Sequence, residues 1–238
     1  YLSCKIALDK GMGINLCGGF HHAFASHEEG FCHLNDMAVA IRKLQEERYI
    51  DRAMVIDCDV HQGNGTASIF QKDATVFTFS IHQDDIYPYP KAYSTYDMGL
   101  HGYLQVDDDK YLKQLKVLPD LIKKHGPDLV IYLAGADPFK EDRLGGFLLT
   151  RQGLMDRDAY VLRLCADRGI PVAVVLGGGY APNIDDTAEI HLNTVKVVHQ
   201  LLKDIHHPDS FYSGGYRPSG NRQPIRTLPY PKAKKVTE

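Results

Sequence analysis

The segment at 53–65, AMVIDCDVHQGNG, constrains the fold more than any other part of the chain. It begins with a short apolar, β-branched run, which is typical of a buried parallel strand, and ends in alternating polar residues and a Gly-rich turn. Because Asp59 and His61 are two positions apart, an extended backbone points both side chains to one side, and Asp57 lies one step deeper. A carboxylate and an imidazole at the carboxyl end of a parallel strand predict a pair of metal ligands. The alternative is a strand end whose acids cap the next helix.

The rest of the chain alternates between apolar runs and helical patterns. Strands are expected at 13–16, 76–81, 128–134 and 170–176, in addition to the one at 54–56. Helices are expected at 37–47, 66–70, 111–124, 152–168 and 186–203. This alternation predicts an α/β fold with a parallel β-sheet and helices on both faces, and an irregular segment at 83–102. We expect one domain over 1–205 and an extended C-terminal tail over 206–238, where Pro, Gly, Ser, Tyr and Arg become frequent.

Further polar residues follow the predicted strands. His21 and His22 come after a Gly pair, Asp137 ends the strand at 128–134, and Tyr180 follows three glycines after the strand at 170–176. Two consecutive histidines favour a catalytic role over a structural one, because neighbouring side chains diverge and each needs a partner. Since the carboxyl ends of parallel strands share one edge of a sheet, these residues are expected to converge there.

The converging residue types predict a hydrolase. Asp59, His61 and Asp137 supply three nitrogen and oxygen ligands, which with an open position describe a catalytic zinc site; Fe(II) or Co(II) are alternatives. Gly63 stands where a second acid could bridge two metals, so a single ion is favoured. An open metal ion polarises a carbonyl and activates water, a His pair supplies general acid and base chemistry, and a Tyr donates to an oxyanion. The set predicts cleavage of an amide or an ester.

Composition excludes several other classes of protein. The net charge of −3 and the pI near 6.5 give no sign of a nucleic-acid-binding surface. Five dispersed cysteines fit reduced thiols in a cytoplasmic protein rather than a disulfide framework. No apolar run approaches the ~20 residues of a membrane span. Neither a P-loop, a nucleophile elbow nor a dinucleotide fingerprint is present.

Five sequence blocks together resemble the zinc-dependent histone deacetylase family. They are GGFHHA at 18–23, GFCHLND at 30–36, VIDCDVHQGNG at 55–65, LAGADPFKEDRLGG at 133–146 and LGGGY at 176–180. The resemblance implies the arginase–deacetylase fold, a three-layer sandwich, and extends over about 15–205. The DRLGG block and Asn64 look more like class II, class IV and bacterial members than class I.

The resemblance implies a role for each matching residue. The zinc would be held by Asp59, His61 and Asp137. Catalysis would depend on His22 as general base and acid, on His21 paired to Asp57, on Asn64 beside the histidines, and on Tyr180 at the acetyl carbonyl oxygen. The acetyl-lysine tunnel would be lined by Gly30, Phe31, Leu144 and Gly178, with Tyr87 or a neighbour in its loop as the opposing aromatic. A structural potassium ion would be bound by carbonyls of Asp57, Asp59 and His61 and by the Ser80-Ile81 segment.

Two departures from the family pattern have consequences. Class I members carry Asp where this chain has Asn64, and an amide stabilises an imidazolium less than a carboxylate does, which predicts a lower pKa for His22 than in an Asp-bearing relative. The family domain also has about a hundred more residues before the GGFHH block, including early strands and a rim acid. We expect that part to be absent from this chain, which would leave a sheet edge exposed.

The function therefore expected is removal of acetyl groups from lysine side chains, with an acetylated protein or peptide as partner. A small acetyl-amide such as an acetylpolyamine is an alternative substrate, although Leu144 stands where that subgroup has an acidic gatekeeper. Removal of longer acyl chains is a further alternative. A different class of function, a non-catalytic binding module that keeps the fold, is the third. We expect no direct nucleic-acid or membrane binding, a possible homo-oligomer, and a cytoplasmic location, or a nuclear one in a eukaryote.

Overall fold

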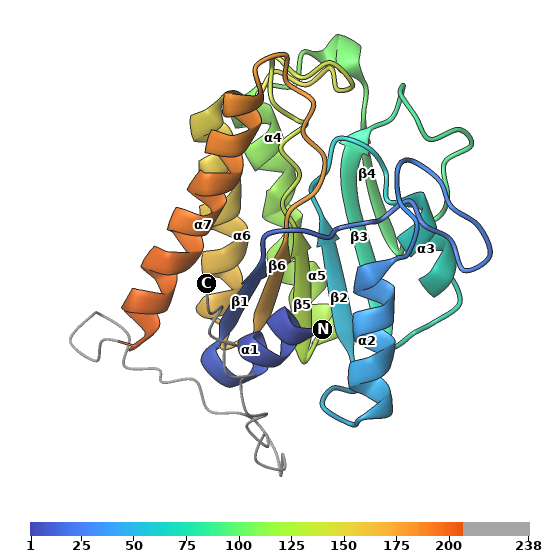
Figure 1. Cartoon of the computed structure of the whole chain (residues 1–238), viewed down its shortest axis with the longest axis vertical. Coiled ribbons are helices and arrows are strands. Elements are labelled where there is room, and N and C mark those ends of the chain that lie inside the picture. The colour runs from blue at the N-terminus through green and yellow to red at the C-terminus, as the bar shows by residue number, and fades with distance from the viewer. Residues whose placement is uncertain (207–238) are drawn as a thin grey trace, which may run out of the picture.

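Six parallel strands form one sheet in the order β1-β6-β5-β2-β3-β4 (Figure 1). The computed structural model describes residues 1–206. The strands are β1 Met12–Asn15, β2 Ala53–Asp57, β3 Val76–Gln83, β4 Tyr96–Leu100, β5 Leu129–Leu133 and β6 Val172–Val175. Five of them confirm the strands expected from the apolar runs, and the predicted α/β fold with a parallel sheet is confirmed.

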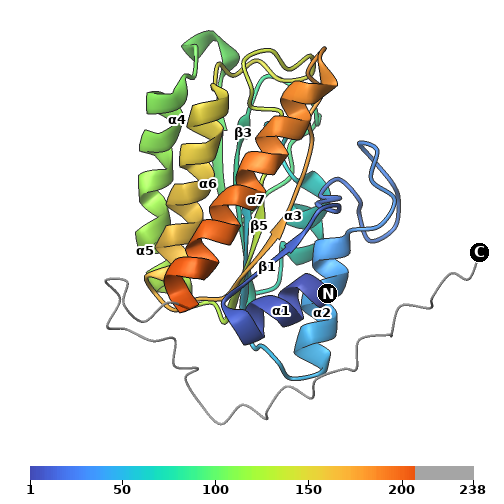
Figure 2. The same cartoon turned by 60° about the vertical axis from the view of Figure 1, so that its left-hand side comes forward.

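The helices cover both faces of this sheet (Figure 2). They are α1 Leu2–Lys10, α2 Asp36–Glu46, α3 Asn64–Phe70, α4 Asp108–Gln114, α5 Leu118–His125, α6 Arg151–Ala166 and α7 Ile184–His206, with short 3₁₀ turns η1 Gly102–Leu104 and η2 Leu115–Val117. The first three helices pack on one face and the last four on the other. The result is the three-layer arrangement expected from the sequence.

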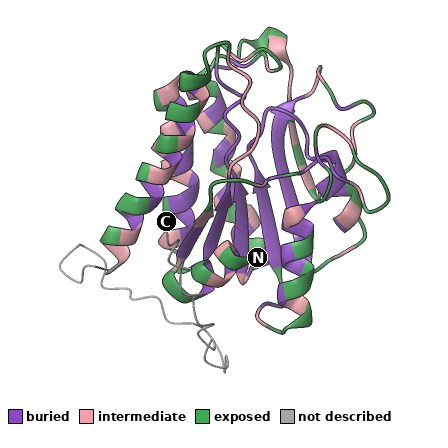
Figure 3. Cartoon of the chain, in the orientation of Figure 1, coloured by how far each residue is buried: buried purple, intermediate pink, exposed green. Residues whose placement is uncertain are grey.

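Two apolar cores lie between these layers. In β5, Val130 and Tyr132 face the core under α4–α7, whereas Leu129, Ile131 and Leu133 face the core under α1–α3. A parallel strand buried on both faces needs an almost continuous apolar sequence, and β2 and β5 are buried at every position (Figure 3). These two central strands lead directly to the predicted metal ligands.

The segment at 83–102, which was expected to be irregular, contains β4, so that expectation was wrong. β4 pairs with β3 alone and lies at the edge of the sheet, and its residues alternate between partly buried and exposed. An edge strand of this kind needs no apolar run, which is why the pattern did not reveal it.

Two further differences concern helices. The single helix expected at 111–124 is interrupted by η2, because Pro119 in the first turn of α5 lacks the N–H that would continue the α-helical hydrogen bonds. α1 was not expected, since only Cys4, Ala7 and Leu8 form its buried side. α7 ends at His206, and the tail predicted beyond it lies outside the described residues. Among the helices of residues 1–206, none is long and apolar enough to cross a membrane.

Candidate active site

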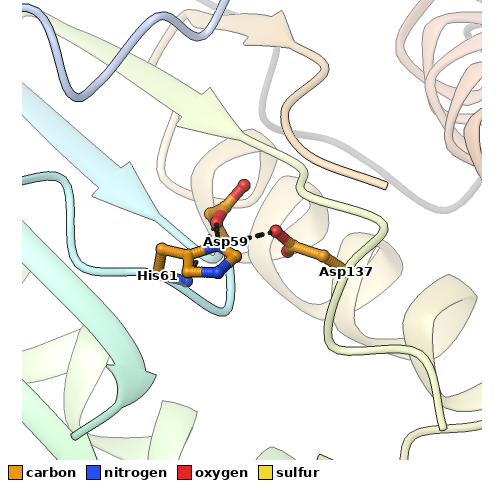
Figure 4. A group of neighbouring side chains, drawn as sticks. All are labelled: Asp59, His61 and Asp137. Atoms are coloured by element: carbon orange, nitrogen blue, oxygen red, sulfur yellow. Dashed lines mark hydrogen bonds and ion pairs between the residues drawn. The ribbon is translucent and has the colours of Figure 1, made fainter. Parts of the chain in front are cut away.

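Three buried side chains converge where β2 and β5 end. Donor atoms of Asp59, His61 and Asp137 all lie within 4.8 Å of one another (Figure 4). His61 Nδ1 is 3.1 Å from Asp59 Oδ1 and 3.1 Å from Asp137 Oδ2. The three residues predicted as zinc ligands are thus brought together at the expected edge of the sheet.

The sheet and the backbone of the following loops hold both carboxylates in place. Asp57 at the end of β2 pairs with Leu133 at the end of β5, so the two loops that follow lie side by side. The N–H of Val60 donates to Asp137 Oδ1 at 2.8 Å, and the N–H of Gly178 donates to Asp59 Oδ2 at 2.8 Å. Each carboxylate therefore has one oxygen fixed by the backbone and the other turned toward His61.

This cluster fits a bound cation. Burial and the neighbouring charge of Asp59 raise the pKa of Asp137 to about 7. Burial opposes a charged His61, but the carboxylates of Asp137 and Asp59 outweigh it and raise the pKa of His61 to about 10. A positive charge between the two buried carboxylates therefore stabilises their ionised forms. One imidazole nitrogen and two carboxylate oxygens form a ligand set suited to zinc.

The adjacent histidines have different partners. His21 Nδ1 lies 2.7 Å from Asp57 Oδ2, and His22 Nδ1 lies 2.7 Å from Asn64 Oδ1. Burial opposes the charged form of both rings. For His21 the Asp57 and Asp59 carboxylates outweigh it and raise the pKa to about 9. For His22, burial and then the charge of His21 lower the pKa to about 3, so this ring is neutral.

A cavity of about 110 Å³ opens onto these residues. It is lined by Gly18, Gly19, Phe20, His21, His22, Gly30, Phe31, Cys32, Asp59, His61, Gly177, Gly178 and Tyr180. The ring of Tyr180 lies 6.5 Å from that of His61 and 6.3 Å from that of Phe31, centroid to centroid. Burial, followed by the Asp59 and Asp137 carboxylates, raises the pKa of Tyr180, so its hydroxyl keeps the proton that a donor needs.

Two glycines leave no room for a side chain. A Cβ at Gly30, whose φ is +51°, would lie 2.3 Å from His22 Cδ2. A Cβ at Gly63 would lie 2.3 Å from Asp57 Oδ2 and 3.1 Å from His21 Nδ1. An acid at position 63 would therefore clash with Asp57 and His21. This steric reason for Gly63 is separate from the expectation that the site holds a single metal ion. Phe31 also has a positive φ of 65°, unusual for a bulky residue, and its side chain is exposed.

Six predicted site residues lie outside the cavity lining: Asp57, Asn64 and Asp137, whose contacts are given above, and Tyr87, Leu144 and Ser80. Tyr87 stands edge-on to His22, with ring centroids 4.9 Å apart, and Leu144 is partly exposed in the loop after Asp142. Ser80 lies beside Asp57 in the sheet, and its hydroxyl is 2.9 Å from His82 Nδ1. The roles assigned to them, including potassium binding, stay predictions.

Two acidic residues in the loops near the site were not singled out from the sequence. Asp142 accepts hydrogen bonds from the N–H of Tyr180 at 2.6 Å and of Leu144 at 2.8 Å, which ties the two loops together. Glu29 contacts Asn64 and Tyr87 through one carboxylate oxygen. Acids in polar loops are common, so only the observed contacts distinguish these two.

The family model, a named relative and a solved structure that match this chain all point to the same protein family. The histone deacetylase domain matches residues 3–198. An uncharacterized protein of Picosynechococcus sp. is 45% identical over 86% of this chain and 67% of its own length. Histone deacetylase 2 of Arabidopsis thaliana is 34% identical over 75% of the chain and 47% of its own length. The crystal structure of the HDA15 HD domain superposes with a TM-score of 0.66 at 26% identity, covering 84% of this chain and 60% of that one. The chain thus spans about half to two thirds of the length of these proteins.

Proposed function

Since the chain belongs to the histone deacetylase family, we propose that it is a zinc-dependent hydrolase that removes acetyl groups from lysine side-chain amides. The observation that carries this proposal is the convergence of the Asp59–His61–Asp137 cluster, the neutral His22 and the protonated Tyr180 at one cavity. A bound zinc ion supplies Lewis acidity, which polarises the amide carbonyl and makes water a better nucleophile at neutral pH.

His22 supplies the proton transfers. The carbonyl oxygen of Asn64 faces His22 Nδ1, so the neutral ring carries its proton on Nδ1 and keeps a lone pair on Nε2. Nε2 takes a proton from the attacking water and later returns it to the departing lysine amine, which balances the reaction. The low pKa of His22 keeps this nitrogen free to accept.

Tyr180 and the cavity walls handle the acetyl group. The Tyr180 hydroxyl donates a hydrogen bond to the carbonyl oxygen as negative charge develops there. The cavity of about 110 Å³ accommodates a small acyl group beside His22, and the exposed ring of Phe31 stands at its mouth. Together these residues orient the amide bond toward His22 Nε2.

Hydrolysis of an acetyl-lysine peptide, with the bound metal quantified, tests this proposal. We expect chelator-sensitive turnover, about one zinc per chain, and a loss of about 10²–10³ in kcat for Tyr180→Phe. Tyr103→Phe, at an exposed tyrosine of η1, is the matched control and should keep full activity. Turnover that persists without metal, or in Tyr180→Phe, contradicts the proposal. Zinc binding without turnover directs the test to fatty-acyl peptides and acetylpolyamines.

A further inference from the structure

Glu29 joins three segments that are distant in the sequence. Its Oε2 lies 2.7 Å from Asn64 Nδ2 and 3.1 Å from the Tyr87 hydroxyl, and both groups donate to it. The backbone of Glu29 is itself fixed, because its carbonyl accepts a 2.7 Å hydrogen bond from the N–H of Cys32 in a tight turn. The carboxylate is therefore aimed at Asn64 rather than free in solvent.

The chemistry of the carboxylate decides which way Asn64 is turned. An ionised carboxylate only accepts hydrogen bonds, so Asn64 must present its NH₂ group to Glu29 and its oxygen to His22. The N–H of Gly65 donates to the same oxygen at 3.1 Å and favours the same orientation. With oxygen facing it, His22 Nδ1 is the protonated nitrogen. A flipped amide would present NH₂ to Nδ1 and move the proton to Nε2, where the reaction needs a lone pair.

We propose that Glu29 is a positioning residue that fixes the amide of Asn64 and thereby the tautomer of His22; this rests on the proposed function of His22 as the general base. Glu29 does not touch the reacting atoms. It also holds Tyr87, whose ring stands edge-on to His22 at 4.9 Å. One carboxylate thus orders two neighbours of the base.

A second role for this acid makes a different prediction. The Glu29 side chain is 37% exposed, so its charge could attract a cationic substrate at the cavity mouth. Charge recognition requires the carboxylate. Positioning requires only an acceptor, which the amide oxygen of Gln also provides. The comparison of Glu29→Ala with Glu29→Gln therefore separates the two roles.

The first readout is the tautomer of His22, measured by ¹⁵N NMR of histidine-labelled, metal-free protein at neutral pH. Wild type and Glu29→Gln should show the proton on Nδ1, and Glu29→Ala should show a mixture of the two tautomers. The matched control is Glu28→Ala, since Glu28 is the adjacent acid but pairs with the exposed His33. Thermal unfolding of each variant separates a change at His22 from a loss of the fold.

The second readout is the division between kcat and KM on an acetyl-lysine peptide. Glu29→Ala should lower kcat about 10–100-fold, a loss like that known for outer partners of metal ligands, with little change in KM. Glu29→Gln should recover most of this loss, and Glu29→Ala should have little further effect in an Asn64→Ala background. An unchanged His22 tautomer in Glu29→Ala overturns the proposal, and so does a Glu29→Gln variant as impaired as Glu29→Ala with a raised KM. If wild type hydrolyses no acyl peptide, the proposed function fails, while the tautomer still decides the role of Glu29.

Discussion

The two ends of β2 and β5 differ in their polar groups: hydrogen bonds pair them at the amino ends, whereas acids are buried close together at the carboxyl ends. At the amino ends, Asp128 Oδ2 accepts hydrogen bonds of 2.9 Å from the N–H groups of Asp51 and Arg52. His125 lies 2.9 Å from both the Ala53 carbonyl oxygen and Arg52 Nη2. At the carboxyl ends, three acids gather in the interior: Asp57, Asp59 and Asp137 are each at most 3% exposed.

The difference between the two ends shows that a cluster of buried acids, rather than the volume of a cavity, distinguishes the candidate active site. A larger cavity of about 390 Å³ lies at the amino end, where its lining includes Phe77, Thr95 and His125. Asp73, Thr95 and His125 in this lining have local hydrogen-bond partners. The carboxyl end gathers three buried acids, whose charge a bound cation would help to balance, and stability alone does not favour such an arrangement.

The largest effect should come from removing one acid at the carboxyl end of β5. Asp137→Asn should abolish zinc binding and lower activity more than about 100-fold, since even outer partners of metal ligands cost 10–100-fold. Zinc at 100 times its Kd should stabilise wild type by about 2.7 kcal/mol and leave Asp137→Asn unchanged. Metal analysis and thermal unfolding with and without zinc measure both effects.

The matched control is Asp128→Asn at the amino end of the same strand. Its amide oxygen still accepts the two backbone hydrogen bonds, so the zinc content should stay at the wild-type level. Equal zinc content in the two variants would remove the distinction between the two ends.

A buried arginine should have the next largest effect. Arg157 in α6 is fully buried, and its Nη1 donates to the carbonyl oxygens of Gly135 at 2.7 Å and of Cys58 at 3.2 Å, next to the loops that hold the metal ligands. Asp158 pairs with it at 2.8 Å. Removing one partner of a buried pair leaves an uncompensated charge, so Arg157→Met should lose about 3–5 kcal/mol in the free energy of unfolding.

Urea denaturation of the metal-free protein measures this loss. The control is Arg163→Met in the same helix, whose side chain is 50% exposed and which should change the free energy of unfolding by less than about 1 kcal/mol. Similar losses of unfolding free energy in both variants would mean that the carboxyl end does not depend on the buried guanidinium of Arg157.

The contrast between the two ends also explains what could be predicted from the sequence. The apolar runs of β2 and β5 and the two-residue spacing of Asp59 and His61 placed the ligands, because strand period and parallel topology determine where such side chains point. β4 was missed because an edge strand needs no apolar run. Glu29 and Arg157 were missed because their roles depend on contacts with residues far away in the chain. Glu29 contacts Asn64, 35 positions away, and Arg157 contacts Cys58, 99 positions away, and no local sequence pattern encodes such contacts.

A substitution at Asn64 sharpens the comparison within the carboxyl end, where His21 faces a carboxylate and His22 an amide. Asn64→Asp should raise the pKa of His22 by about one to three pH units, because a carboxylate stabilises the imidazolium. The new carboxylate would also face Glu29 in place of a donor. The substitution is therefore best made together with Glu29→Gln, whose amide can donate to it.

NMR titration of His22 in the metal-free protein measures this change, with Glu29→Gln alone as the reference. Asn193→Asp on α7 adds the same charge at a distance and should leave the pKa of His22 where it is. An unchanged or lower pKa for His22 in the Asp-bearing protein would refute the explanation based on its partner.

The smallest effect should come from His125 at the amino end. Burial, with the nearby Arg52 guanidinium, lowers the pKa of His125 below its ordinary value near 6.5. The neutral ring suits its contacts, since Nε2 donates to the Ala53 carbonyl and Nδ1 accepts from Arg52. The folded protein therefore binds this proton more weakly than the unfolded chain does. The contribution of His125 to stability is complete above pH 6.5 and is lost as the pH falls below 6.5 toward the lowered value.

Free energies of unfolding at pH 8 and pH 5.5 test this sign. Wild type should lose more stability on acidification than His125→Gln, because Gln has no proton to gain, and the control His199→Gln on the exposed side of α7 should follow wild type. Other groups titrate in all three proteins, so the difference between the variants isolates His125. Parallel losses in wild type and His125→Gln would show that this histidine binds its proton equally in the folded and unfolded states. The amino end would then tolerate a second positive charge beside Arg52, and its hydrogen bonds would not require the neutral ring.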